Sequence, residues 1–505
     1  MSQKKERIGL IIPGSIFLNN ERNFIHLGIL RCAAALEALG YEIDMLDLCG
    51  VKNYEQAAKD YINSTDTKTI GITGTSPQMP QVDRICTALR EERSDLKLIL
   101  GGPHPTVVNA ARKKEKKKGI ESRAHVAFNR LYEIVDVVVA GDGEDSIETA
   151  IYSPKGTLVD ADDPDSRMFL TKSRLSELPL PSRHLVDMQS YKYYIDGESS
   201  TSLIMQLGCA MACRFCSGRL SPTYRRVRIR AIDSVLNEIR HLHEVYGYKS
   251  FQLYDDELNL SPSMIPDLKA IIKLQEQLGV SFKFRGFIKS HLFNREQAKY
   301  LKECGFSQIC IGFETGSDRI LQNIKKQASK KQNSECVEIA KEAGLKIKAF
   351  MSLGHPHESD QTVKDTCEWL INMEVEEFDC SVVSPFPGCP YYDESTPFDP
   401  KNGIWRYQVP ENGDNLYSVD VDYVKTTQYY KGDRNLGYSS FVYTDFLKAE
   451  EVVKARDWIE DTVRQKLNLP YFQTAAAINY DHSMGTLPPH ILRSSLVRPD
   501  SLRVS

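Results

Sequence analysis

The sequence predicts an α/β protein of two or three domains. Three observations support this prediction. The chain has 505 residues, which is room for more than one hydrophobic core. Short apolar runs of strand length alternate with helical patterns, and this alternation is typical of parallel sheets covered by helices. These runs fall into two groups, separated by a stretch rich in Pro, Asp and Ser.

The first group spans residues 1–150 and predicts a Rossmann-like or flavodoxin-like domain that binds a ligand. Its strand-like runs end in glycine or small polar residues, and ligands bind beyond the carboxyl ends of such strands. The runs are RIGLIIPG (7–14), EIDMLDL (42–48), TIGITGTS (69–76), LKLILGG (96–102) and VDVVVAGDGE (135–144). Helical patterns at 27–40 and 81–92 lie between them. The basic segment between Ala110 and Ala124 is interpreted as a solvated helix face or loop, with phosphate binding less favoured.

Composition and the amino-terminal residues bear on location and partners. The net charge of −4 gives no general reason to expect nucleic acid or an anionic membrane surface. The run after the basic residues KKER superficially resembles a signal peptide, but Pro13 and Gly14 break it and no cleavage site follows. No apolar run is long enough to span a membrane. We therefore expect a cytoplasmic protein whose twelve cysteines are thiols or metal ligands rather than disulfides.

The second group spans residues 199–395 and follows a connector expected at 151–198. Six strand-and-helix units predict a partial or full (β/α) barrel, with its site at the carboxyl ends of the strands. The strand-like runs are SLIMQLG (202–208), SFQLYDD (250–256), SFKFRGF (281–287), QICIGFET (308–315), KIKAFMSLG (346–354) and EFDCSVVSPF (377–386).

Residues 396–505 predict a small, mostly helical domain. An aromatic, turn-rich stretch precedes a long helical pattern at 448–467, and residues 473–505 look irregular. Trp405 and the tyrosines around it would either line a lid over the barrel or pack a small core. The sequence leaves these two roles open.

A cysteine cluster marks the start of the second group. The stretch MQLGCAMACRFCSGR at 205–219 places Cys209, Cys213 and Cys216 at spacings of four and three residues. A structural zinc site needs four ligands, and the next cysteine, Cys304, is isolated after a helical pattern. Three core thiols are disfavoured because the segment lacks the periodicity of a buried element. Three thiolates on an iron–sulfur cluster would leave one iron open to a small molecule.

This spacing, with Phe215 just before the last cysteine, resembles the radical S-adenosylmethionine (SAM) superfamily. The resemblance implies that the three cysteines bind a [4Fe-4S] cluster and that SAM binds the open iron. Further stretches resemble motifs of that superfamily, namely LYDDELNL (253–260), IGFETGSDRIL (311–321), MSLGHPHES (351–359) and PFPGCP (385–390). The implied SAM contacts are Phe215, Asp255, Asp256, Glu257, Glu314, Ser352 and Gly354.

Two residues depart from these motifs. Thr315 stands where the superfamily usually has serine, and His357 stands where it usually has glycine. The second departure bears on how closely the backbone approaches SAM at that loop. Neither His355 nor His357 is assigned a catalytic role, because polar histidines are common in loops.

The first domain resembles the cobalamin-binding domain that is fused to many such enzymes. A plain Rossmann domain is disfavoured because the G-x-G-x-x-G fingerprint is missing after the first strand. The implied cobalamin contacts are Thr73, Thr75, Ser76, Gly101, Gly102, His104, Gly141, Gly143 and Glu144. The D-x-H-x-x-G motif that supplies a histidine to cobalt is absent, since Phe24 and Ile29 flank His26 where aspartate and glycine would stand. We therefore predict that His26 is structural and that the cobalt lacks a protein histidine.

The combined resemblance implies a cobalamin-dependent radical SAM methyltransferase. A 5′-deoxyadenosyl radical would activate an unactivated carbon of a small-molecule substrate, and methylcobalamin, recharged by a second SAM, would supply the methyl group. An external electron donor such as flavodoxin or ferredoxin is implied. The alternatives are a related enzyme that catalyses cyclisation, oxidation or rearrangement, and a sensor without turnover. A methylthiotransferase is disfavoured because Cys32, Cys49 and Cys86 form no second triad.

Overall fold

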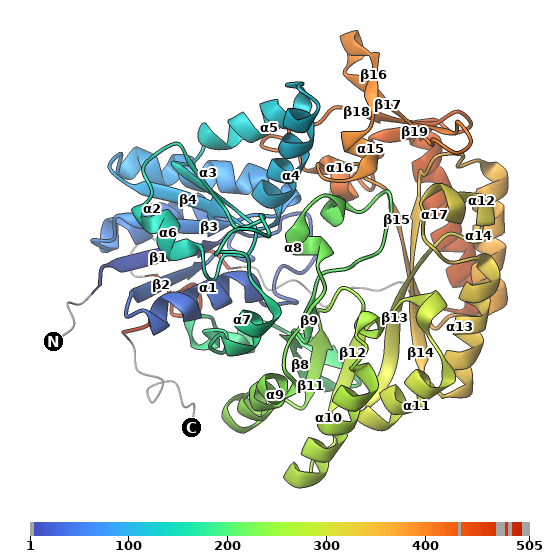
Figure 1. The fold of residues 1–505 in the computed structure, drawn as a ribbon, viewed down its shortest axis with the longest axis horizontal. Helices are drawn as coiled ribbons and strands as arrows, with labels where there is room; N and C mark the ends of the chain where they lie inside the picture. Colours follow the sequence, from blue (N-terminus) through green and yellow to red (C-terminus); the bar gives the residue numbers. More distant parts are fainter. Residues whose placement is uncertain (1–4, 433–435, 471–479, 483–486, 497–505) are drawn as a thin grey trace.

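The computed structural model describes residues 5–432, 436–470, 480–482 and 487–496. Two sheets with helices packed against them lie side by side, and a smaller antiparallel sheet lies above the second one in the view of Figure 1. No described helix is long and apolar enough to cross a membrane.

The amino-terminal sheet has the strand order β20-β2-β1-β3-β4-β5-β6. The five strands expected in residues 1–150 are all present, and they pair in parallel. The strands are β1 (Arg7–Ile12), β2 (Glu42–Asp47), β3 (Thr69–Thr73), β4 (Lys97–Gly101), β5 (Val137–Ala140), β6 (Thr157–Asp160) and β20 (Leu492–Ser494). The helices are α1 (Leu27–Ala38), α2 (Tyr54–Ser64), α3 (Met79–Glu92), α4 (Pro103–Lys117), α5 (Arg123–Tyr132) and α6 (Ile147–Tyr152). The basic segment is therefore mainly the end of α4.

The second sheet is an open half-barrel with the strand order β15-β14-β13-β12-β11-β8-β7, so the barrel is partial. Its strands are β7 (Tyr193–Ile195), β8 (Glu198–Leu203), β11 (Ser250–Leu253), β12 (Lys283–Phe287), β13 (Phe306–Glu314), β14 (Lys346–Leu353) and β15 (Glu377–Val382). The helices of this part are α8 (Pro222–Arg225), α9 (Ile232–Tyr246), α10 (Met264–Leu278), α11 (Arg295–Cys304), α12 (Asp318–Asn323), α13 (Lys330–Glu342) and α14 (Asp360–Met373). All six expected strands are present.

The first expected strand of the half-barrel is divided in two. β8 ends at Leu203, and β9 (Gln206–Leu207) leaves the sheet to pair antiparallel with β10 (Arg228–Ile229). The cysteine segment follows β9 directly, so this departure carries it over the carboxyl end of the half-barrel.

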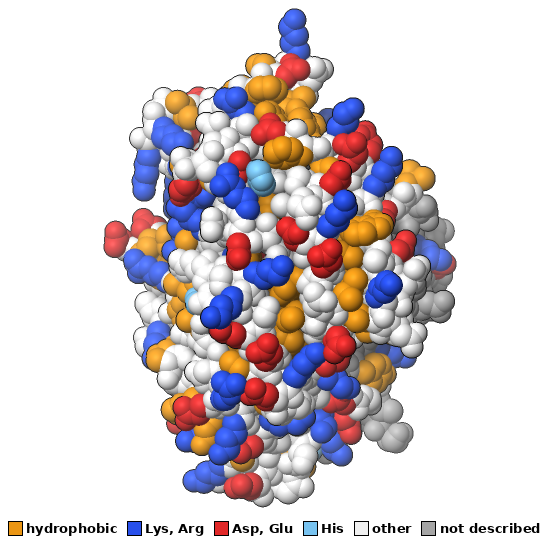
Figure 2. Space-filling view, turned by 90° about the vertical axis from the view of Figure 1, so that its right-hand side faces the viewer, with side chains coloured by type: hydrophobic (Ala, Val, Ile, Leu, Met, Phe, Trp, Pro, Cys, Tyr) orange, Lys and Arg blue, Asp and Glu red, His pale blue; other side chains and the backbone are white. Residues whose placement is uncertain are grey.

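Alternate side chains of the half-barrel strands face opposite sides. Apolar side chains such as Phe251, Phe284 and Phe306 are buried and stack on one another beneath the outer helices. The helices α11 and α13 carry ion pairs on their exposed sides, as Lys299–Glu303 shows. Figure 2 shows the outer face, where acidic and basic side chains are interspersed.

The connector and the carboxyl-terminal segment are more structured than expected. The connector at 151–198 contains β6, α7 (Lys172–Glu177) and β7. The segment 396–505 contains the expected long helix, α17 (Ala449–Leu467), but it is not mostly helical. It also forms an antiparallel sheet of β16 (Thr396–Asp399), β17 (Ile404–Gln408), β18 (Asn415–Val419) and β19 (Val442–Thr444).

Two short helices complete this part, α15 (Pro390–Asp393) and α16 (Gln428–Lys431). Much of the stretch 473–505, expected to be irregular, lies outside the described residues. Its described part includes β20, which pairs antiparallel with β2 and returns the chain to the first sheet.

Candidate functional site

The cysteine segment is held in place by acidic side chains that follow β11. Asp255 Oδ1 accepts hydrogen bonds from the backbone N–H of Met205 (2.8 Å) and Gln206 (2.5 Å). Asp256 Oδ2 accepts one from Gly208 N (2.8 Å). Gly208 has a φ of +89°, and an added Cβ would collide with the backbone of Arg226, so only glycine fits this turn. The chain therefore enters the cysteine segment along a fixed path.

All three cysteines line one cavity of about 270 Å³. Cys213 is buried, whereas Cys216 is exposed and lines the cavity. Desolvation by the surrounding protein raises the pKa of the Cys216 thiol to about 12. No group of three His, Cys, Asp or Glu side chains in the described residues is close enough to hold one metal ion. In a cluster each cysteine binds a different iron, so the sulfurs stand further apart than around a single ion. The three cysteines on one cavity fit the three thiolate ligands of such a cluster.

A buried polar network lies beside this cavity, at the carboxyl ends of β13 and β14. Glu314 accepts hydrogen bonds from Lys326 Nζ (2.7 Å) and Ser352 Oγ (2.8 Å). Ser352 Oγ also lies 2.8 Å from Nε2 of His355. Burial favours the neutral carboxyl, but Lys326 and these hydrogen bonds hold the pKa of Glu314 below its ordinary value. Phe215 packs 5.4 Å from the His355 ring.

The structure thus brings Phe215, Glu314 and Ser352 together around His355. Gly354, the last predicted SAM contact on this side, has a φ of +88° and lies at the start of the loop after β14. The residue that was expected to disturb this loop, His357, also has a positive φ of 77°. The backbone here keeps the conformation that glycine favours, although the residue is a histidine.

The three acidic residues after β11 differ in what they contact. Asp255 Oδ1 accepts the two backbone amides, whereas its Oδ2 is buried and unpaired, and burial raises the pKa of Asp255 to about 7. Glu257 is half-buried, its Oε2 is buried and unpaired, and desolvation raises its pKa to about 7 as well. Unpaired carboxylate oxygens are therefore present on Asp255 and Glu257, and Asp256 is the one of the three acidic residues that lines the cysteine cavity.

Two buried lysines at this site were not predicted from the sequence. Lys289 is 2% exposed, and its Nζ lies 3.9 Å from Cys213 Sγ. Lys326 is 4% exposed and pairs with Glu314. A lysine directly after a buried strand run, as in SFKFRGFIK, is the signal that could have found the first of them. The charge on both would attract the carboxylate of a bound ligand or the negative charge of thiolates.

The amino-terminal domain has a separate cavity of about 220 Å³ at the carboxyl ends of its strands. Six glycines line it, and so do Thr73 and Glu144. The glycines are Gly28, Gly71, Gly101, Gly102, Gly141 and Gly143. Gly102 has a φ of +99°, and its added Cβ would lie 2.6 Å from Thr73 Oγ1. The lack of side chains leaves room for a bulky group such as a cobalamin nucleotide tail, so the residues fit the group that the sequence implied.

Three predicted cobalamin contacts do not line this cavity. Thr75 caps the short turn at 76–78, and Ser76 Oγ lies 2.8 Å from His104 Nδ1. His104 is buried, and burial lowers its pKa to about 3. It lines a different cavity, of about 280 Å³, with Arg123 and Tyr392. His26 Nε2 lies 3.5 Å from Cys49 Sγ, which is consistent with the structural role predicted for it.

The two cavities adjoin one another. Pro103, at the start of α4, and Tyr224, in α8, line both of them. Leu207 and Thr223 of the half-barrel part also line the glycine cavity. The buried ion pair Arg228–Asp142 and the hydrogen bond from Ser221 Oγ to Asp162 Oδ1 (2.5 Å) join the two domains beside it. Ligands in the two cavities would therefore be neighbours.

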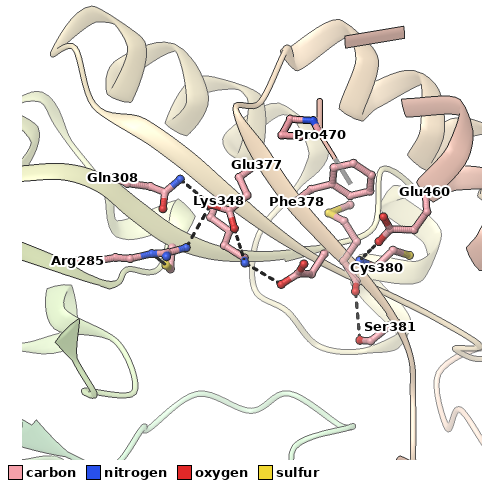
Figure 3. Close-up of polar contacts among 12 residues, drawn as sticks. Arg285, Gln308, Lys348, Glu377, Phe378, Cys380, Ser381, Glu460 and Pro470 are labelled. Carbon is pink, nitrogen blue, oxygen red and sulfur yellow. Dashed lines mark hydrogen bonds and ion pairs between the residues drawn. The ribbon is translucent and has the colours of Figure 1, made fainter. Parts of the chain in front are cut away.

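Charged side chains also lie on the inner face of the half-barrel, nearer the amino-terminal ends of the strands. Lys348 bonds Glu377 Oε1 (2.5 Å) and Asp379 Oδ2 (2.9 Å), and Arg285 Nη2 lies 3.4 Å from Glu377 Oε2. Figure 3 shows these groups projecting from one face of the strands, while Glu460 of α17 bonds the backbone of Cys380 from the other side. Lys348 precedes Ser352 by four residues on β14, or about 13 Å at ~3.3 Å per residue.

Comparisons with known proteins agree with this geometry. Residues 203–370 match the model of the radical SAM superfamily, and residues 18–121 match that of the B12 binding domain. An uncharacterized methyltransferase of Pyrococcus horikoshii is 25% identical over 354 residues, covering 70% of this chain and 71% of that protein. The anaerobic magnesium-protoporphyrin IX monomethyl ester cyclase of Rubrivivax gelatinosus is 20% identical over 378 residues, covering 72% and 64%.

A solved structure shares the architecture of the whole chain. It is the radical S-adenosylmethionine methyltransferase TsrM from Kitasatospora setae, solved with cobalamin and a [4Fe-4S] cluster bound. The TM-score is 0.65 at 16% identity, and the match covers 90% of each chain. This likeness shows the fold.

Proposed function

We propose that this chain, which belongs to the cobalamin-dependent radical SAM enzymes, methylates an unactivated carbon of a small molecule. The observation that carries the proposal is the junction of the two cavities at Pro103 and Tyr224. A radical site and a methyl donor must both reach one substrate carbon, and only adjoining sites permit this.

The cofactors bring the reactive groups. When bound, the [4Fe-4S] cluster and SAM supply a 5′-deoxyadenosyl radical, and methylcobalamin supplies the methyl group. Cys209, Cys213 and Cys216 would hold the cluster, and the glycine cavity would hold the nucleotide tail of cobalamin. The task of the chain is to position these groups and to exclude water.

The buried charges would orient SAM. Glu257, with its unpaired oxygen, and Asp256 suit the SAM ammonium group. Lys289 and Lys326 suit the SAM carboxylate, because both are buried cations near Cys213. Because the protein shields these side chains from water, each charge pair with SAM would be stronger than the same pair in water.

We place the substrate on the inner face of the half-barrel, above the pairs formed by Lys348 and Arg285. A substrate resting there would present a carbon near the level of Ser352. Buried ion pairs suit a polar small molecule better than a hydrocarbon, because an apolar group would leave nearby charges poorly solvated. A cytoplasmic location and an external flavodoxin or ferredoxin as electron donor remain part of this proposal.

A related reaction without methyl transfer is the second candidate. It is favoured by the similarity to the magnesium-protoporphyrin IX monomethyl ester cyclase, which covers 72% of this chain. Both reactions would use the same two cavities.

The SAM products separate the two candidates. The reconstituted enzyme, given reductant and candidate substrates, should form 5′-deoxyadenosine and S-adenosylhomocysteine together as product appears. This pairing follows because one SAM yields the radical and another recharges the methyl carrier. Formation of 5′-deoxyadenosine with product but without S-adenosylhomocysteine would reject methylation in favour of the second candidate.

A further inference from the structure

The tip of the β17–β18 hairpin reaches back to the cysteine segment from outside the matched domain. The tip comprises residues 409–414, VPENGD, whereas the radical SAM match ends at residue 370. A tight turn closes it, with hydrogen bonds from Val409 N to Asp414 O and from Gly413 N to Val409 O, both 2.8 Å. Val409 is 1% exposed, so the tip is anchored in the core.

The first contact of the tip is with the cysteine segment itself. Both oxygens of Glu411 accept hydrogen bonds from Arg214 Nη2 at 2.6 Å. Arg214 lies between Cys213 and Cys216, and its side chain is 6% exposed. The Arg214 hydrogen bond lowers the pKa of Glu411 to about 2. Arg214 also donates to the backbone oxygen of Asn323 (3.0 Å), at the end of α12.

The second set of contacts is with the segments that carry Lys326 and His357. Glu411 Oε1 lies 3.2 Å from Lys325 Nζ. Asp414 Oδ2 accepts hydrogen bonds from Arg319 Nε and Asn323 Nδ2, both at 2.8 Å. Asp414 Oδ1 lies 3.3 Å from Nδ1 of His357.

A further bond closes the network around Asn323. Asn412 Nδ2 donates to Asn323 Oδ1 (2.7 Å), and Asn323 Nδ2 donates to the backbone oxygen of Pro356 (2.9 Å). Asn323 is 1% exposed. The tip thereby joins the end of α12 to the loop after β14.

The backbone in these segments is strained. Seven non-glycine residues of the described chain have a positive φ, and four of them lie here, namely Glu314, Lys325, Gln327 and His357. Lys325 and Gln327 flank Lys326, which pairs with Glu314. Such conformations cost free energy and persist only when surrounding contacts enforce them. The tip contacts two of the four directly, Lys325 through Glu411 and His357 through Asp414.

We propose that Glu411 and Asp414 are positioning residues for SAM. They hold the strained turn around Lys326 and the loop at His357 in the shape that presents Lys326, Glu314 and Ser352 to the ligand. Without them, Lys325 and Gln327 can relax to ordinary conformations, and Lys326 then leaves its place beside the cysteine cavity. This inference rests on the proposed SAM site, but it does not depend on methyl transfer.

The test measures SAM binding rather than turnover. The variants Glu411→Gln and Asp414→Asn remove the charge and keep the shape of each side chain. In reconstituted enzyme with full iron content, we expect the Kd for SAM to rise by about 10-fold in each variant, the usual scale for a lost supporting contact. We also expect a smaller change of the reduced-cluster EPR signal on adding SAM.

Asp445→Asn is the matched control. Asp445 accepts hydrogen bonds from Asn415 (3.1 Å) and Tyr417 (3.0 Å) of β18, so it supports the same hairpin without touching the SAM segments. This variant should bind SAM like the parent. Parental SAM affinity and EPR response in both Glu411→Gln and Asp414→Asn would overturn the proposal, as would an equal loss in Asp445→Asn. Failure of the parent itself to bind SAM would instead reject the proposed function.

Discussion

The two cofactor regions differ in the residues that form them. Six glycines line the cavity of the amino-terminal domain, where the absence of side chains makes the space. The SAM side instead holds several buried charges, as Lys289, Glu314 and Lys326 show. The first region should lose cobalamin when a larger side chain is added. The second should lose its cluster or its affinity for SAM when a thiol or a charged group is removed. Experiments can test this contrast one side at a time.

Removal of a thiol should have the largest effect. Cys213 stands between the other two cysteines in sequence, is buried, and has its Sγ 3.9 Å from Lys289 Nζ. The variant Cys213→Ala should lose the [4Fe-4S] cluster, because two thiolates do not hold a cubane cluster. Iron and sulfide analysis after anaerobic reconstitution measures this. Parental iron and sulfide content in the variant would show that the cluster assignment is wrong.

Addition of bulk to the glycine cavity should remove cobalamin and spare the cluster. Gly28 lies in α1 and lines the cavity, and an added Cβ there meets no atom within 4 Å. The variant Gly28→Leu should therefore fold, fill the space and lose bound cobalamin. Gly28→Ala is the matched control and should retain it. We expect Gly28→Leu to keep its cluster and to cleave SAM to 5′-deoxyadenosine, without methylated product.

Gly28 is a better position for this test than Gly102. Gly102 has a positive φ, and a side chain there would press on Thr73, so a substitution would disturb the fold as well as the cavity. If Gly28→Leu binds cobalamin like the parent, the cavity does not hold the nucleotide tail. If the Gly28→Leu variant folds but no longer cleaves SAM, the SAM site depends on the glycine cavity, contrary to the contrast drawn above.

Neutralisation of Glu257 should change the pH dependence of SAM binding. Burial raises the pKa of Glu257 to about 7, so its carboxyl is largely protonated below that pH. Cationic SAM prefers the carboxylate, and binding must then release the proton. SAM affinity should fall as pH drops below 7, approaching about tenfold per pH unit.

Calorimetry at several pH values checks this expectation. In Glu257→Gln the affinity should be lower at pH 8, and the fall below pH 7 should disappear. Asp255→Asn is the comparison, because Oδ1 of Asp255 already accepts two backbone hydrogen bonds, whereas no such bond holds Oε2 of Glu257. A pH profile that is unchanged by Glu257→Gln but lost in Asp255→Asn would assign the ammonium contact to Asp255.

Replacement of His26 should have the smallest effect. Its ring contacts Cys49, and burial lowers its pKa. The variant His26→Ala should leave the optical spectrum of bound cobalamin unchanged and cost about 1–2 kcal/mol of stability through lost packing. A changed spectrum would show that His26 binds cobalt, and that the domain relies on a side chain as well as on glycines.

The contrast also explains what the sequence could predict. Glycines after buried strands are visible in sequence, and Thr73, Gly101, Gly102, Gly141, Gly143 and Glu144 do line the cavity. The cysteine spacing is equally visible, and the three cysteines do share a cavity. Ser76 and His104 were misplaced because they follow the same strands, yet their side chains bond each other away from the glycines.

Other features depended on long-range packing. Lys326 becomes part of the site only because the backbone at Lys325 and Gln327 adopts unusual conformations. In the sequence Asp255 resembles its neighbours Asp256 and Glu257. In the structure its Oδ1 accepts a hydrogen bond from the backbone N–H of Met205. The carboxyl-terminal sheet was missed because its strands are short and aromatic, whereas α17 has a long and clear helical period.

The most direct test of methyl transfer between the two regions is isotopic. The parent enzyme is incubated with SAM that carries a fully deuterated methyl group, reductant and candidate substrates, and the products are analysed by mass spectrometry. We expect a product that retains all three deuterons, formed by the parent and by Gly28→Ala but not by Gly28→Leu. A product without deuterium, or a labelled product from a Gly28→Leu enzyme that holds no cobalamin, would contradict the account.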